Sequence, residues 1–473
     1  MDRAHEYFSS PLCRAARRRL TPSACRLLAL QDATLVFAAG SIVHFLDLNT
    51  MTTSYLPSVG GNEVGCIEVQ VERKLIAICE KGNMPNVFIY EYPSLNLKRV
   101  LRNGTERAYS AVNFSGDGEK LATVGSFPDY MITVWDWNKE NIILRTKAFS
   151  QEVYRVSFSP RFEGQLVTSG MAHIRFWKMA QTFTGLKLQG DIGKFGQVEL
   201  SDISGYCELP DGKILSGSDW GNLLLWEGNL IKCEITHGSV LPAPSGKPSG
   251  LKCHAGAIDV VMLDGAQIIT GGADGYLRTW NLAEIEQAEV TDELPKFLIK
   301  PTKEVKLLGV EEGRTKSRIV TMLKGSDHWL VQDAEGSVYK VVLETGAAQT
   351  LFSFHSGGIA ALDVSPFNHC CATAGSDGSV RLWDYVEKSV TCLHRSPAAA
   401  TCISWASRAV DPEGRTLATA YADGVVRILV RCKDGLQLRT AFKPHGVAIG
   451  AMAYSPDGAH LATGAADGTV FFI

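Results

Sequence analysis

One short pattern recurs through the chain and restricts its fold more than any other feature of the sequence. Each copy combines a small apolar segment containing threonine, an Asp-Gly pair and a second, alternating segment. The clearest copies are "IITGGADGYLRTWN" (268–281), "CATAGSDGSVRLWD" (371–384), "LATAYADGVVRILV" (417–430) and "LATGAADGTVFFI" (461–473). Asp-Gly between two alternating segments is a sequence signature of a tight β-hairpin. Each copy therefore predicts two antiparallel strands joined by a short turn.

Weaker copies extend the pattern toward the N-terminus at a regular spacing. The second strand of each unit ends about 42 to 59 residues after the previous one, near Leu46, Tyr90, Trp135, Trp177, Trp226, Trp280, Tyr339, Trp383, Leu429 and Phe472. Propeller blades of four strands with a Trp-Asp signature repeat every 40–45 residues. The sequence therefore predicts an all-β fold, the WD-repeat β-propeller.

Ten units exceed the four to eight blades of one propeller. We expect one seven-bladed ring over residues 26–350, followed over residues 351–473 by the first three blades of a second propeller. Residues 1–25 are expected to be a disordered tail. Because three blades cannot close a ring and the last one stops within an apolar strand, the sequence predicts a truncated second propeller in a larger protein.

Two units carry a complete set of polar residues that WD repeats share. The resemblance to WD repeats implies a hydrogen-bond network of a turn Asp, a His in the preceding loop, a Ser or Thr on the first strand and the Trp. The two sets are His254, Thr270, Asp274 and Trp280, and His355, Thr373, Asp377 and Trp383. The unit with His445, Thr463 and Asp467 places Ile473 where the Trp would be.

A His, a hydroxyl and an Asp also suggest nucleophilic catalysis, but the repetition argues against it. A catalytic triad occurs once per active site, whereas this set recurs at the blade period. Motif searches find no phosphate-binding loop, no zinc spacing and no calcium loop. We therefore expect no catalytic, cofactor-binding or metal-binding residues, no small-molecule substrate and no enzymatic activity.

Composition narrows the choice of partner. The net charge of −3 disfavours a nucleic-acid or anionic-membrane binder, and no apolar run approaches the length needed to cross a bilayer. The 12 cysteines are scattered, with no Cys-x-x-Cys pair, which favours reduced thiols in a cytosolic-type compartment.

Residues 86–235 resemble a particular family within the WD-repeat proteins. The stretches "TKAFSQEV" and "WGNLLLWEGNLIK" are similar to the cilia- and flagella-associated WD-repeat family of the dynein tether. The resemblance implies an axonemal scaffold with paired N-terminal propellers and a coiled coil, the last of which this chain lacks. Its implied partners are inner-arm dynein heavy chains, a second tether WD-repeat subunit and the doublet microtubule.

Two other classes of function are alternatives to this scaffold. A soluble adaptor for a ubiquitin ligase or a trafficking complex would need an arginine-lined peptide pocket, and no Arg cluster recurs at the loop positions. A propeller enzyme would need a convergent polar cluster at the channel. Two insertions, 236–252 and 284–306, are candidate partner surfaces because long loops carry recognition in rigid scaffolds.

Overall fold

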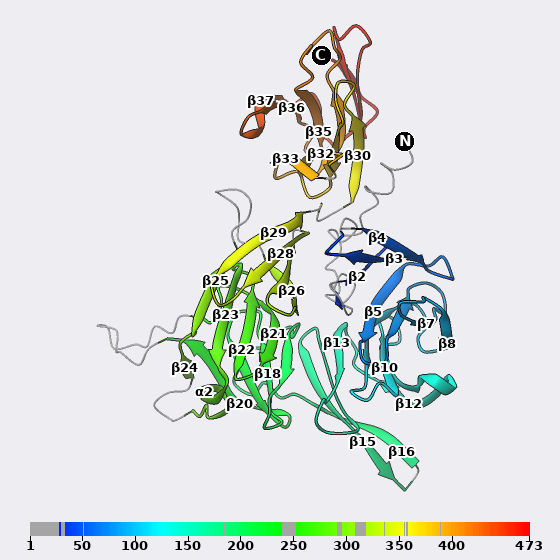
Figure 1. Cartoon of the computed structure of the whole chain (residues 1–473), viewed down its shortest axis with the longest axis vertical. Helices are drawn as coiled ribbons and strands as arrows, with labels where there is room; N and C mark the ends of the chain where they lie inside the picture. Colours follow the sequence, from blue (N-terminus) through cyan, green and yellow to red (C-terminus); the bar gives the residue numbers. More distant parts are fainter. Residues whose placement is uncertain are drawn as a thin grey trace, which may run out of the picture. The chain divides into compact units, whose positions relative to one another are not determined.

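The computed structural model describes most of the chain (Figure 1). The described residues are 28–29, 34–50, 52–183, 185–238, 252–290, 296–307, 318–334, 336–353, 355, 358–387 and 389–473. They divide into two compact units, one ending at Phe352 and the other beginning at Ser353. The expected tail over residues 1–25 lies outside the described residues.

The described part of the first unit holds seven β-sheets, and in all but the fifth and sixth the strands follow one another directly along the chain. Strands paired within a sheet are antiparallel, apart from β20 (Leu230–His237) and β24 (Phe297–Ile299), which are parallel. The first sheet comprises β1 (Leu28–Ala29), β2 (Thr34–Ala39), β3 (Ile42–Asp47) and β4 (Thr53–Pro57), and the second comprises β5 (Val64–Gln70), β6 (Leu75–Glu80), β7 (Val87–Glu91) and β8 (Leu97–Leu101). The third sheet comprises β9 (Tyr109–Phe114), β10 (Lys120–Gly125), β11 (Met131–Asp136) and β12 (Asn141–Lys147). The fourth comprises β13 (Val153–Phe158), β14 (Gln165–Gly170), β15 (His173–Thr182) and β16 (Gly185–Ile192).

Sheets five to seven complete this unit. The fifth sheet comprises β17 (Tyr206–Glu208), β18 (Ile214–Gly217), β19 (Leu223–Glu227), β20 (Leu230–His237) and β24 (Phe297–Ile299). The sixth comprises β21 (Ile258–Asp264), β22 (Gln267–Gly272), β23 (Tyr276–Asn281) and β25 (Lys303–Lys306). The seventh comprises β26 (Ile319–Lys324), β27 (Trp329–Asp333), β28 (Ser337–Val342) and β29 (Ala347–Ser353). The helical elements of the described residues are short: a 3-10 turn, η2 (Trp137–Lys139), and α2 (Leu282–Glu286). None of the described helices is long and apolar enough to cross a membrane.

The inner strands are apolar because a sheet packs on both of their faces. Every residue of β6 is buried, whereas β4 is largely exposed. A strand covered on both faces reads as a continuous run of small and branched apolar residues. The threonine-containing segments 267–272, 370–375 and 416–421 of the repeat are such strands, which explains why they lack a polar alternation.

The core of this unit is a succession of layers between neighbouring sheets. Leu215 and Leu225 of the fifth sheet pack with Ile268 and Trp280 of the sixth, for example. A further cluster joins the first sheet to the seventh and contains Leu35, Phe37, Leu46, Leu330 and Val338. Sheets that are far apart in sequence therefore share buried apolar surface.

The expected insertion at 284–306 is wrong in part, because it contains regular structure. β25 pairs with β23 as the outer strand of the sixth sheet, and β24 adds a parallel strand to β20 of the fifth. The charged residues of "KEVK" misled the prediction, although an outer strand tolerates charges on its solvent face. In the other insertion, 236–252, Thr236 and His237 belong to β20, and residues 239–251 lie outside the described residues.

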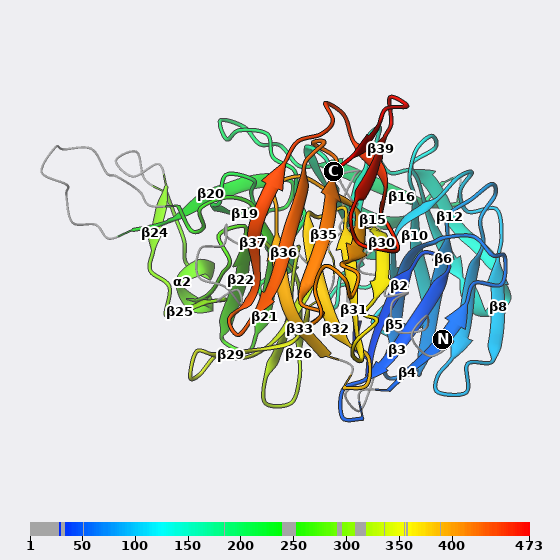
Figure 2. The same ribbon diagram turned by 90° about the horizontal axis from the view of Figure 1, so that it is seen from above.

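The second unit holds three sheets in its described residues. They comprise β30 (Ile359–Val364), β31 (Cys370–Gly375), β32 (Ser379–Asp384) and β33 (Ser389–Arg395); β34 (Ala400–Trp405), β35 (Thr416–Tyr421), β36 (Val426–Cys432) and β37 (Gly435–Phe442); and β38 (Ile449–Tyr454), β39 (Leu461–Ala465) and β40 (Val470–Phe472). Figure 2 shows β35, β36 and β37 side by side. Leu382 and Leu417 belong to the cluster between the first two sheets, and Val426 and Ile449 to the next.

Candidate functional site

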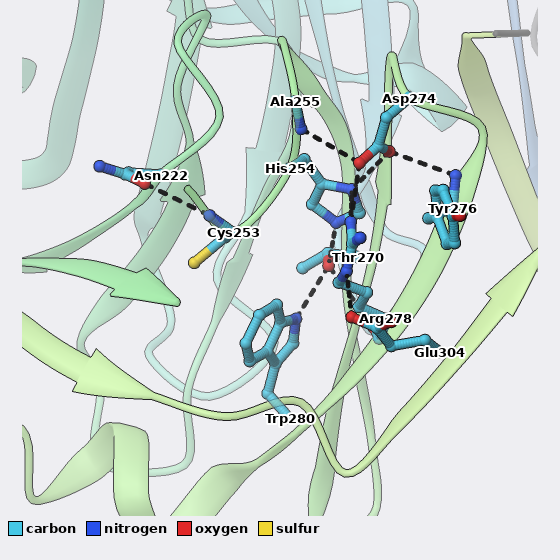
Figure 3. Close-up of polar contacts among 10 residues, drawn as sticks. All are labelled: Asn222, Cys253, His254, Ala255, Thr270, Asp274, Tyr276, Arg278, Trp280 and Glu304. Carbon is cyan, nitrogen blue, oxygen red and sulfur yellow. Dashed lines mark hydrogen bonds and ion pairs between the residues drawn. The ribbon is translucent and has the colours of Figure 1, made fainter. Parts of the chain in front are cut away.

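A chain of side-chain hydrogen bonds crosses the sixth sheet of the first unit (Figure 3). His254 precedes β21, Thr270 lies on β22, Asp274 in the β22–β23 turn and Trp280 on β23. His254 Nδ1 lies 2.9 Å from Asp274 Oδ1, and its Nε2 lies 2.7 Å from Thr270 Oγ1. Trp280 Nε1 donates to the same hydroxyl at 2.9 Å. The structure thus brings all four of these sequence-predicted residues together.

The contacts of His254 define its protonation. Burial lowers its pKa, which favours the neutral ring. Nδ1 also lies 2.9 Å from Arg278 Nη1, but that nitrogen has the carboxylate of Asp274 as an acceptor at 2.8 Å. Because an unprotonated Nδ1 would point its lone pair at the carboxylate of Asp274, we assign the proton to Nδ1, which donates to Asp274. Nε2 then accepts from the hydroxyl of Thr270, which in turn accepts from Trp280. One threonine hydroxyl therefore provides the hydrogen-bond partner for two buried aromatic side chains, at His254 Nε2 and Trp280 Nε1.

Asp274 is held as a carboxylate. Burial raises its pKa, but hydrogen bonds from His254, Arg278 and the backbone of Ala255 outweigh burial, so the pKa lies well below its usual range. The backbone N–H of Ala255 donates at 3.1 Å, and Arg278 Nη1 at 2.8 Å. Arg278 also donates its Nε to Glu304 of β25 at 2.8 Å. Asp274 therefore joins the loop before β21 to the turn that follows β22.

The second predicted set lies on β31, β32 and the residues around them. His355 Nε2 lies 2.7 Å from Thr373 Oγ1, and Trp383 Nε1 donates to that hydroxyl at 2.8 Å. His355 Nδ1 lies 3.2 Å from Asp377, whose carboxylate also accepts from Ser379 Oγ at 2.7 Å. Burial opposes the ionisation of Asp377, but these bonds hold its pKa well below the usual range.

The third predicted set lacks the Trp, as the sequence indicated. His445 Nε2 lies 3.0 Å from Thr463 Oγ1, while Thr469 Oγ1 stands between His445 Nδ1 (2.8 Å) and Asp467 (2.7 Å). Ile473 exchanges backbone hydrogen bonds with Leu461. Trp280 holds the same register opposite Ile268, so Ile473 occupies the position of the tryptophan.

Three further Trp–hydroxyl pairs were missed, because the sequence interpretation required the whole set. In each pair the indole N–H donates at 2.9 Å to a Ser or Thr on the neighbouring strand: Trp135 to Thr123, Trp177 to Thr168 and Trp226 to Ser216. In the third sheet, Thr105 donates to the turn carboxylate of Asp129 at 2.8 Å, where the other sets have histidine. A Ser or Thr nine to twelve residues before each Trp was the available signal.

Turn glycines link each of three sheets to the next one along the chain. Their positive φ angles favour glycine, and an added Cβ would lie about 2 Å from a carbonyl oxygen of the following sheet's entry loop. The three glycines and the residues whose carbonyl oxygens they approach are Gly221 with His254, Gly378 with Ser396, and Gly424 with His445. In each pair the backbone N–H of the second residue donates to the carbonyl oxygen of the glycine, at 2.8, 2.9 and 3.4 Å respectively.

These sets cannot perform nucleophilic catalysis as they stand. Thr270 and Thr373 are fully buried, and His254 and His355 are each only 1% exposed. The hydroxyls are engaged by an imidazole and an indole, so no substrate carbonyl can reach them. No group of His, Cys, Asp and Glu in the described ranges is arranged to hold a metal ion. The arrangement satisfies buried polar groups and links strands to turns.

Two other buried histidines, His44 and His173, should make the free energy of unfolding depend on pH. Burial lowers the pKa of His44 and of His173 to about 4. Between pH 4 and the unfolded value of 6.5, only the unfolded chain takes up these protons, so stability falls as the pH falls.

We expect His44→Phe to remove about 2 kcal/mol of the stability lost between pH 7 and pH 5. His44 stacks on Phe37, so a phenyl ring suits the site. Urea denaturation at the two pH values measures the effect, with the exposed His460→Gln as the control. An unchanged pH slope in His44→Phe would contradict the assignment.

Comparison with known proteins gives the family. The family model described as the echinoderm microtubule-associated protein first beta-propeller matches residues 61–303, more than half of the chain, and the WD domain, G-beta repeat matches residues 347–384 and 435–473. Proteins named cilia- and flagella-associated protein 44 are also similar. The relative from Mus musculus is 44% identical over 94% of the chain, that from Chlamydomonas reinhardtii 44% over 93%, and that from Trypanosoma brucei brucei 34% over 94%.

The chain covers 25%, 25% and 26% of these three relatives, about a quarter of their length. The paired strands, the Trp–hydroxyl bonds and the matched models agree on one architecture. The chain belongs to the WD-repeat β-propeller family whose model describes the first propeller of echinoderm microtubule-associated protein, and it resembles cilia- and flagella-associated protein 44 over almost its whole length.

Proposed function

We propose that this chain is a non-catalytic scaffold of the axoneme in cilia and flagella. It acts as a WD-repeat component of the tether that links inner-arm dynein motor domains to doublet microtubules and regulates beating. The names of the relatives support the location. The observation that carries the non-catalytic role is the repeated His–Thr–Trp set, which is sealed in the sheet cores and engaged in structural hydrogen bonds.

The scaffold has two rigid parts in this proposal. Residues 26–350 form one closed ring of seven blades, and residues 351–473 form three blades of a second propeller. The cluster that joins Leu35 and Phe37 to Leu330 and Val338 supports closure, because it packs the first blade on the seventh. Stacked blades give stiff surfaces on which partners can be held at fixed positions. The partners we propose are inner-arm dynein heavy chains, a second tether WD-repeat subunit and the doublet microtubule.

Localisation and cross-linking in ciliated cells test the role. We expect the tagged chain to lie along the cilium, to remain after the membrane is removed with detergent, and to cross-link to dynein heavy chains and tubulin. As a control, Val59→Ser changes an exposed side chain and should leave the localisation unchanged. Release of the wild-type chain with the detergent-soluble fraction, or cross-links to non-axonemal proteins alone, would refute the proposal.

A further inference from the structure

One hairpin of the first unit extends beyond its sheet. β15 and β16 hold 10 and 8 residues, and their pairing continues to Thr182 opposite Gly185. β14 pairs with β15 only up to Lys178, so the segment beyond it is a two-stranded ribbon. Figure 1 shows this hairpin projecting outward from the sheets of its unit.

The two faces of the projecting hairpin differ in character. Side chains alternate along paired strands, so Met179, Leu186 and Leu188 share one face. Met179 and Leu188 pack against the core between the third and fourth sheets, and Leu186 continues this face outward at 41% exposure. At the tip, Phe183 is fully exposed. The apolar face therefore ends in an aromatic side chain that nothing in the described part of the chain covers.

The opposite face carries positive charge. Lys178 and Lys187 are exposed there, and neither has an ion pair among the described residues. Asp191, opposite Phe176, lies on the same face nearer the base of the hairpin, and Arg175 lies on the other face. Residues 173–192 together hold three basic residues and one acidic residue. The whole chain has a net charge of −3, so the hairpin is a basic projection on an acidic protein.

We propose that the β15–β16 hairpin docks onto an axonemal protein surface that offers an apolar pocket rimmed by acidic side chains. Phe183 fills the pocket, and Lys178 and Lys187 face the acidic rim. Aromatic anchors dominate protein interfaces, and complementary charge gives them specificity. A lipid surface fits less well, because one phenylalanine and one leucine are a small apolar anchor. The inference rests on the axonemal role proposed above.

Sedimentation with demembranated axonemes from cells that lack the protein tests the docking. The purified chain is added at increasing concentration. We expect Phe183→Ser to bind at least tenfold more weakly than wild type, and Lys178→Glu with Lys187→Glu to weaken binding as strongly at low salt. Leu230→Ser is the matched control, since Leu230 is an exposed apolar residue at the next sheet's hairpin. All variants should keep the wild-type melting temperature.

A photo-reactive residue identifies the surface. With p-benzoylphenylalanine at position 183, we expect cross-links to an acidic, partly apolar surface of one axonemal protein, and none from position 230. Equal binding of Phe183→Ser and wild type overturns the hairpin proposal and leaves the scaffold role intact. Binding to phosphatidylserine vesicles that Phe183→Ser abolishes overturns it in favour of a lipid. If the wild-type chain does not sediment with axonemes, the scaffold role fails and the hairpin proposal with it.

Discussion

Replacing Gly378 by alanine is expected to destabilise the second unit by about 3 kcal/mol or more. Gly378 has a φ of +76°, which strains any residue with a Cβ, and the new Cβ would lie 2.1 Å from the carbonyl oxygen of Ser396. That oxygen belongs to the backbone, so no side-chain rotation relieves the clash. The contact between the first two sheets of the unit would have to open.

Gly468→Ala separates the two causes of this effect. Gly468 occupies the equivalent turn with a φ of +82°, and no atom lies within 4 Å of the position of its Cβ. Alanine there should cost only the backbone strain, about 1 kcal/mol. Hydrogen exchange of β31 and β34 in the two variants measures the difference. Equal protection of these strands in both variants would show that the turn glycine does not link neighbouring sheets.

Thr270→Val is expected to destabilise the first unit by about 2–6 kcal/mol. The substitution keeps the shape of the side chain but removes the hydroxyl between His254 and Trp280. Both aromatic side chains are then left buried without a partner for Nε2 and Nε1, and each such group costs about 1–3 kcal/mol. Urea denaturation followed by tryptophan fluorescence measures the loss.

Thr419→Val is the matched control. Thr419 lies four residues before the turn Asp423, as Thr270 lies before Asp274, and both are fully buried. The hydroxyl of Thr419 has no hydrogen-bond partner among the described residues. Its removal should therefore be neutral or stabilising. A similar loss in both variants would mean that packing, and not the shared hydroxyl, accounts for the effect at Thr270.

The hairpins could be predicted from sequence because they depend on local chemistry. Asp274 and Gly275 specify their turn through a carboxylate that accepts backbone N–H groups and a glycine at φ +73°. The residues that complete the network recur at a fixed spacing from this turn, so two full sets were visible. The third sheet was harder, because Thr105 replaces the histidine and residues 126–130 replace the Asp-Gly turn.

Contacts between sheets leave little trace in the sequence. In the sequence, Gly378 cannot be told from any other turn glycine. Its close approach to Ser396 depends on how the next sheet packs. β25 was hidden for a similar reason, since a charged outer strand resembles a loop until its partner β23 is known. The projecting hairpin was overlooked as well, because Phe183 resembles a core residue when only its type is considered. These features depend on packing and not on a local pattern.

We propose that the seven sheets of the first unit close into one ring that serves as a scaffold. An electron cryo-microscopy map of the purified 473-residue chain would show whether the ring is closed. We expect seven radial blades over residues 26–350, with Leu35 and Phe37 packed against Leu330 and Val338, and the Thr270 hydroxyl bonded between His254 and Trp280. A gap between the first and seventh sheets, or a solvent-open cleft that exposes His254 and Thr270, would contradict it.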